Sequence, residues 1–171
     1  MRIPAELRPE QVVAVVDDNE RLPFDLAPLQ HVRGTLDVGR YSVLGLEHVI
    51  AVHRRSLDEL LSSVGSGREF FAREVQRMLA YPVRALVVEA SWLDVERGNW
   101  HPRVTPASVV GSLVGWIAHG LPVVMAGDRA RAGKLTSRLL FTAARRRWRE
   151  FREMANQVHD KRASRLDTSG D

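Results

Sequence analysis

The sequence predicts a protein of the α/β class, with one sheet covered by helices on both faces. Three observations lead to this prediction. A continuous apolar run, typical of a strand buried on both faces, occurs at 12–16, and two further largely apolar segments that predict buried strands lie at 84–90 and 121–126. Segments with a helical spacing of apolar residues lie between them, so these strands are expected to run parallel. Two β-branched runs, at 41–44 and 49–52, are separated by a short turn-like loop and predict a β-hairpin.

The second strand of this hairpin leads directly into a helix. Ser56 and Glu59 have the spacing of a capping box, so Ser56 is expected at the N-cap and Glu59 as its partner rather than as a metal ligand. His53 and Arg55 lie two residues apart, which places their side chains on the same face of the strand. A strand end beside a helix N-terminus suits phosphate, so Arg54 and Arg55 are candidate phosphate contacts.

Two further helices follow from periodicity and capping residues. One is expected over 68–81 and the other from Pro106, with Thr105 as its N-cap. Residues 92–105 show no period and predict the longest loop. The helix that begins at Pro106 has a face of small residues, which we expect to pack against the sheet rather than a partner helix: Ser108, Gly111, Ser112 and Gly115.

The composition bounds the class of protein. The chain has 171 residues, of which 44% are hydrophobic, enough for one domain with its own core. It has no cysteine, which excludes disulfides and thiolate metal sites. Neither a secretory signal nor a long apolar run is present, so a cytoplasmic protein without a membrane partner is expected. The domain is expected to occupy 1–155, and 156–171 to form a disordered polar tail.

The positive charge is concentrated near the C-terminus. The formal net charge is +4, and the segment 129–149 contains eight basic residues and no acidic one. Such a segment is either a solvated helix face or a binding surface for DNA or another polyanion, and the absence of acids favours the second reading. On a helix, four arginines share one stripe: Arg138, Arg145, Arg149 and Arg152.

Three short motifs occur in an order that is similar to a known family. They are Val16-Asp17-Asp18-Asn19-Glu20, Gly39-Arg40-Tyr41 and His53-Arg54-Arg55-Ser56-Leu57-Asp58-Glu59-Leu60. Residues 12 to about 150 thereby resemble the XPF-type nuclease domain, a branch of the restriction-endonuclease-like PD-(D/E)XK superfamily. In that family the motifs read Val-Asp-x-Arg-Glu, Gly-Asp-Tyr and Glu-Arg-Lys followed by Ser-Leu-Asp-Asp-Leu. The resemblance implies a three-layer α/β/α fold, with a mixed central sheet and a β-hairpin that carries the motif.

The chain departs from the family at the residues that hold the metal ion. The resemblance places a degenerate catalytic site at Asp17, Glu20, Arg40, His53, Arg54, Arg55 and Glu59. Arg40 stands in place of the family's aspartate, His53 of its glutamate, Arg55 of its lysine and Glu59 of its last aspartate. Arginine does not deprotonate in proteins, so it cannot act as a base, and Arg40 brings a fixed positive charge to the metal position. These changes imply a DNA-binding protein that is catalytically impaired and needs no cofactor.

Two alternatives stay open. The chain could be an active endonuclease that cuts branched or junction DNA, with Asp17, Glu20 and His53 holding Mg²⁺ or Mn²⁺ and Asp37 or Glu89 as an additional ligand. It could instead serve only in protein assembly, through the small-residue helix. The expected partners are DNA and, in the non-catalytic reading, a second copy or an active nuclease subunit.

Overall fold

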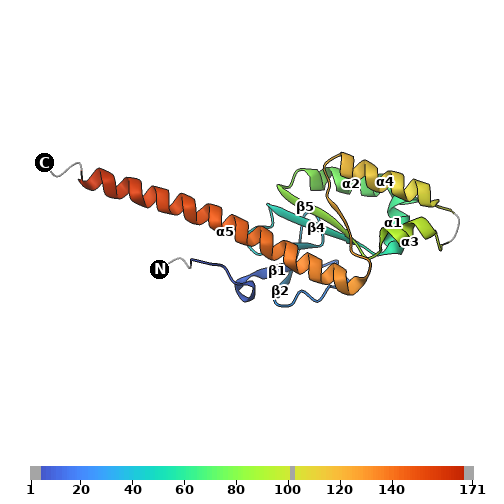
Figure 1. Ribbon diagram of the computed structural model, residues 1–171, viewed down its shortest axis with the longest axis horizontal. Helices are drawn as coiled ribbons and strands as arrows, with labels where there is room; N and C mark the ends of the chain where they lie inside the picture. The colour runs from blue at the N-terminus through green and yellow to red at the C-terminus, as the bar shows by residue number, and fades with distance from the viewer. Residues whose placement is uncertain (1–4, 101–102, 168–171) are drawn as a thin grey trace.

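A mixed β-sheet lies between two helical layers (Figure 1). The computed structural model describes residues 5–100 and 103–167, with side chains as far as Val158. Within these residues the sheet has six strands in the order β2-β1-β3-β4-β5-β6. The strands are β1 (Val13–Asp17), β2 (Gln30–Gly34), β3 (Tyr41–Val43), β4 (Ile50–Arg55), β5 (Val83–Val88) and β6 (Val123–Met125). The helices are η1 (Pro9–Gln11), α1 (Leu57–Val64), α2 (Arg68–Leu79), α3 (Trp92–Arg97), α4 (Pro106–Ala118) and α5 (Arg129–Asp167).

The direction of the strands changes at the hairpin. Strand β3 runs antiparallel to both β1 and β4, whereas β4, β5 and β6 are parallel and β2 is parallel to β1. The expected mixed sheet is therefore confirmed, and the parallel arrangement predicted from the alternation of strands and helices holds for β4 to β6. Strand β2 was not predicted. It lies at the edge of the sheet with most side chains exposed, so it lacks an apolar pattern.

The two faces of the sheet have separate apolar cores. Helix α5 covers one face, where Val16, Val52 and Val87 pack against residues such as Leu140. Helices α1 to α4 cover the other face. Because successive side chains of a strand alternate between faces, Arg54 points toward the α5 side and His53 and Arg55 toward the α1–α4 side. The ends of β1, β4 and β5 thus bring polar side chains to both sides of one sheet edge.

Two expectations from the sequence are wrong. The predicted loop 92–105 contains α3, because Ser91 and Asp94 form a capping box that starts a short helix. The small-residue face of α4 does not pack on the sheet: an added Cβ at Gly111 or Gly115 would meet nothing within 4 Å. Val109 and Leu113 take that role instead.

The last helix is longer than the apolar pattern of the sequence indicates. Helix α5 continues through most of the segment expected to be a disordered tail and ends at Asp167. The segment is polar, but it is rich in residues of high helix propensity such as alanine, arginine and lysine. In Figure 1 this part of α5 projects beyond the sheet. Among the described residues, no helix combines the length and apolar character needed to cross a membrane.

Candidate functional site

Asp17 ends strand β1 and is fully engaged by donors. Its Oδ1 accepts hydrogen bonds from the backbone N–H of Asn19 at 3.1 Å and from Nη1 of Arg40 at 2.8 Å. Its Oδ2 accepts one from the backbone N–H of Leu36 at 3.0 Å. Burial would raise the pKa of Asp17, but these three donors outweigh burial and hold the pKa below its usual value. The carboxylate of Asp17 is therefore ionised, and both of its oxygens already accept hydrogen bonds.

Arg40 reaches Asp17 because strands β1 and β3 pair in an antiparallel register. The backbone N–H of Asp17 donates to the carbonyl of Arg40, and that of Arg40 donates to the carbonyl of Val52. The side chain of Arg40 is 32% exposed and that of Asp17 only 3%. A guanidinium thus occupies the place where the resemblance puts an acidic metal ligand.

Arg54 is the centre of a second, more buried group of charges. Its Nε donates to Glu20 at 2.9 Å, and its Nη1 donates to Glu89 and lies 3.5 Å from Glu59. Burial acts to lower the pKa of Arg54, but the hydrogen bond and charge of Glu20, with the other carboxylates, raise it overall. Glu89 also pairs with Arg129 at 3.2 Å. Arg54 therefore joins three segments of the chain, and we expect it to act within this network rather than on a phosphate.

His53 and Arg55 lie together on the opposite face of β4, as the alternation of strand side chains predicts. The ring of His53 meets that of Phe71 edge-on, with centroids 5.8 Å apart, and the guanidinium of Arg55 lies 4.5 Å from the same ring. Burial, and then the charge of Arg55, lower the pKa of His53 to about 3. Burial lowers the pKa of Arg55 to about 10, and its Nε donates to Ser63 at 3.0 Å. His53 is therefore a neutral, buried ring near pH 7.

The predicted capping box at the start of α1 is confirmed. The backbone N–H of Glu59 donates to Oγ of Ser56 at 3.2 Å, and Oε2 of Glu59 accepts from the backbone N–H of Ser56 at 2.8 Å. Burial raises the pKa of Glu59, but the bond from Ser56 and the charge of Arg54 lower it overall. Glu59 therefore serves as a cap and as one of the anions around Arg54.

In their observed positions, these side chains are not arranged to coordinate a divalent cation. Within the part of the chain that the structure describes, no group of three histidine or acidic residues is arranged to hold a metal ion. Asp17 and Glu20 are each paired with an arginine. Glu20 lies with Arg54 on the α5 side of the sheet, whereas His53 points to the α1–α4 side. Asp37 is exposed, and its backbone carbonyl accepts from Arg77. Of the alternative ligands, Glu20 and Glu89 come together, but they do so around Arg54, whose guanidinium holds both carboxylates.

The four arginines of the predicted stripe on α5 line two separate cavities. Arg138 borders a groove beside β5 and β6, together with Val83, Val87 and Val124. The other three line a cavity closed by residues 5–7 of the N-terminal segment: Arg145, Arg149 and Arg152. The stripe is thus not one continuous surface.

Several residues of the site were not predicted. Phe24 lies under two guanidinium groups, with its centroid 5.8 Å from Arg54 and 5.2 Å from Arg129. Arg33 donates to the backbone carbonyls of Asp17 and Glu20, at 3.0 and 2.7 Å. Glu89, by contrast, was expected as a possible ligand, and it follows β5 directly, where the carboxyl ends of parallel strands meet at one edge. No sequence feature of this kind pointed to Phe24 or Arg33.

The sheet order, the helical layers and the polar hairpin strand together define a restriction-endonuclease-like α/β fold. The solved structures with this fold include XPF from Aeropyrum pernix, which has a TM-score of 0.62 and 18% sequence identity, over 87% of this chain and 73% of that one. A second structure, XPF from Aeropyrum pernix in complex with DNA, has a TM-score of 0.60 and 18% identity, over 78% of this chain and 65% of that one. The expected XPF-type nuclease fold is thus confirmed. No family model matches the sequence, and no curated protein matches it either.

Proposed function

We propose that this protein binds DNA through its XPF-like fold and does not cleave it. The observation that carries the proposal is the ion pair between Asp17 and Arg40, at 2.8 Å. Hydrolysis of a phosphodiester by a site of this kind needs carboxylates that are free to coordinate Mg²⁺. Here Asp17, Glu20 and Glu89 are each neutralised by an arginine. The carboxylates hold the fold together instead of a metal ion.

Two observations support DNA as the ligand. One similar structure is a complex of XPF with DNA, and the present chain shares that fold. In addition, α5 offers arginines at 145, 149 and 152 that form no ion pair with a carboxylate among the described residues. Phosphate contacts by such side chains supply most of the affinity of a DNA-binding surface. Branched or junction DNA is the proposed substrate class, and a second copy or an active nuclease subunit is the proposed protein partner.

The test uses labelled fork, flap and linear duplex DNA, with Mg²⁺, Mn²⁺ or a chelator. The wild-type protein should shift the mobility of the DNA in every condition and yield no cleavage product in any. The alternative function, an active endonuclease with rearranged ligands, predicts a product that disappears with the chelator and in Asp17→Ala. That result would overturn the proposal. Absence of any salt-dependent DNA affinity would also overturn it and would favour a role in protein assembly alone.

A further inference from the structure

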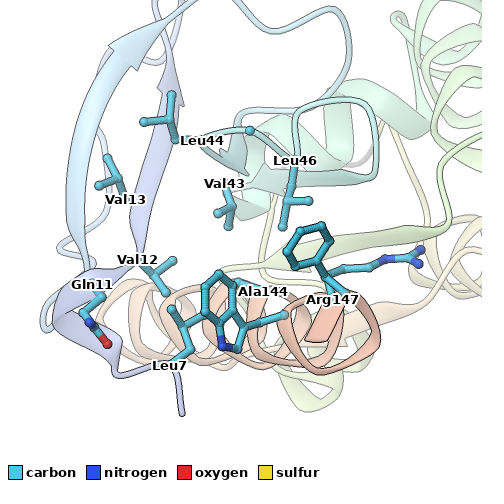
Figure 2. A pocket seen from close by; sticks show the side chains of 12 residues that line it. Leu7, Gln11, Val12, Val13, Val43, Leu44, Leu46, Ala144 and Arg147 are labelled. Atoms are coloured by element: carbon cyan, nitrogen blue, oxygen red, sulfur yellow. The ribbon is translucent and has the colours of Figure 1, made fainter. Parts of the chain in front are cut away.

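An apolar groove of about 410 Å³ lies between the β3–β4 turn and α5. Figure 2 shows Leu44 and Leu46 of the turn on one side, Ala144 of α5 on the other, and Leu7 and Val12 nearby. The guanidinium of Arg147 points away from these side chains. Leu44 is 57% exposed and Phe151, which also borders the groove, is 49% exposed. The volume is in the range of ligand sites, which begins at about 300 Å³.

A smaller cavity of about 250 Å³ adjoins this groove along α5. Its walls include the side chains of Arg145, Arg149 and Arg152, which share one side of the helix. The exposed Glu6 also lines it but forms no ion pair with them among the described residues. Three guanidinium groups around one cavity make it a site for anionic oxygen, above all phosphate.

The charge pattern of α5 separates this cavity from the rest of the helix surface. Arg146 and Arg147, which do not line the cavity, both pair with Glu150, at 3.0 and 2.9 Å. Arg145 instead lies over the ring of Phe141, 5.3 Å from its centroid, and Arg152 donates to the backbone carbonyl of Ala5. The arginines around the cavity therefore have no carboxylate partner among the described residues, while Arg146 and Arg147 share Glu150.

Leu7 and Trp148 line both cavities, so the apolar groove and the three arginines are separated by one layer of side chains. The rings of Trp148 and Phe151 lie 6.5 Å apart, tilted by 34°, and both border the groove. A ligand that fits this pair of cavities has an apolar, flat part and a phosphate close to it. An apolar peptide segment would leave the three cations without a counterpart.

We propose that the two adjoining cavities bind one unpaired nucleotide of a DNA strand, with its base in the apolar groove and its phosphates on Arg145, Arg149 and Arg152. This inference rests on the proposed DNA binding and adds the part of the DNA that is recognised. Bases in a duplex are stacked and paired, so only an unpaired nucleotide offers its faces to aromatic side chains. The site therefore favours DNA with a single-stranded end or gap over continuous duplex.

The test compares three labelled DNAs by fluorescence anisotropy at several salt concentrations: a blunt duplex, the same duplex with a short single-stranded overhang, and that overhang without its bases. The wild-type protein should bind the intact overhang about tenfold more tightly than the abasic one. Phe151→Ser and Leu44→Asn change exposed apolar side chains without altering charge. They should remove this difference and leave the affinity for blunt duplex unchanged. Val158→Ser, at a 65% exposed position of α5 outside the groove, is the matched control and should keep the difference.

The outcomes separate this inference from the proposed function. Equal affinity for intact and abasic overhangs, with normal salt-dependent binding, would overturn the inference and leave DNA binding intact. Absence of binding to all three DNAs would overturn both. A dimer that Phe151→Ser dissociates would also overturn the inference, because a second copy would then cover the groove.

Discussion

The Nη1 atom of Arg40 lies 2.8 Å from Oδ1 of Asp17, so a guanidinium and a carboxylate meet at the end of strand β1. One positive and one negative side chain attract each other without a metal ion. Two carboxylates would instead repel each other until a cation bound between them. In the proposed non-catalytic function, this ion pair takes the place of a metal-bound pair of carboxylates.

Replacing Arg40 by aspartate should make the stability of the protein depend on metal. Arg40→Asp places a second carboxylate beside the buried Asp17, so the melting temperature should fall in a chelator. Millimolar Mn²⁺ should then raise it, because a cation that binds only the folded state stabilises that state. Differential scanning fluorimetry with and without Mn²⁺ measures both effects. Arg40→Gln, which adds no carboxylate, is the control, and an equal rise with Mn²⁺ in the wild type would contradict the prediction.

The protein should become less stable as the pH falls, because of His53. The pKa of this ring is lowered to about 3 by burial, and then by Arg55, whereas an unfolded histidine titrates near 6.5. Between these values the unfolded state binds one more proton, so the free energy of unfolding should drop by about 1.4 kcal/mol per pH unit as the pH falls. Above pH 6.5 this contribution is fully present.

Chemical denaturation of His53→Gln over the same pH range isolates this effect, since glutamine does not titrate. The variant should show a flatter pH dependence than the wild type. His31→Gln, at an exposed position of β2, should retain the wild-type slope. Identical slopes for the wild type and His53→Gln would show that His53 titrates normally in the folded protein.

Removal of the Arg54 guanidinium should destabilise the protein strongly. Arg54→Met leaves Glu20 and Glu89, whose side chains are 4% and 10% exposed, without their shared cation. Loss of one partner from a buried ion pair costs about 3–5 kcal/mol. Urea denaturation measures the change. Arg146→Met, which breaks an ion pair of an 80% exposed side chain, should leave the midpoint unchanged. A small effect of Arg54→Met would mean that Glu20 and Glu89 take up protons or find other donors.

The arginines of α5 should differ in their contribution to DNA binding. Arg145→Ala and Arg149→Ala should each weaken the binding of all sequences alike and reduce the slope of log affinity against log salt by about one unit. Arg146→Ala is the matched control, since Arg146 pairs with Glu150 and does not line the cavity. A salt titration by anisotropy gives the slopes. Equal slopes for the wild type and both test variants would place the DNA elsewhere on the protein.

The strands and the site were predictable to different extents. The apolar runs around Val16 and Val87 located the buried strands, and the capping box at Ser56 located the start of α1, because these features are local. The pairing of Arg54 with Glu20 and Glu89 was not predictable, because the three residues lie 34 and 35 positions apart and meet only through the sheet order. The resemblance placed the changed residues in one site. It did not indicate which carboxylate pairs with each arginine.

The cavities along α5 were also not predictable from the sequence alone. The spacing of Arg138 and Arg145 put both on one helical stripe, yet the residues packed around α5 place them in different cavities. Periodicity gives the direction of a side chain about the helix axis. It does not give the neighbours that close a cavity, such as residues 5–7 beside Arg149.

The Arg54 network holds together the loop after β1, the end of β4 and the end of β5 with a cation that is part of the chain itself. Unlike a bound metal ion, this cation is covalently attached and cannot dissociate from the chain. The stability that this network contributes should therefore not depend on the concentration of divalent ions, whereas acid that protonates the carboxylates should weaken it.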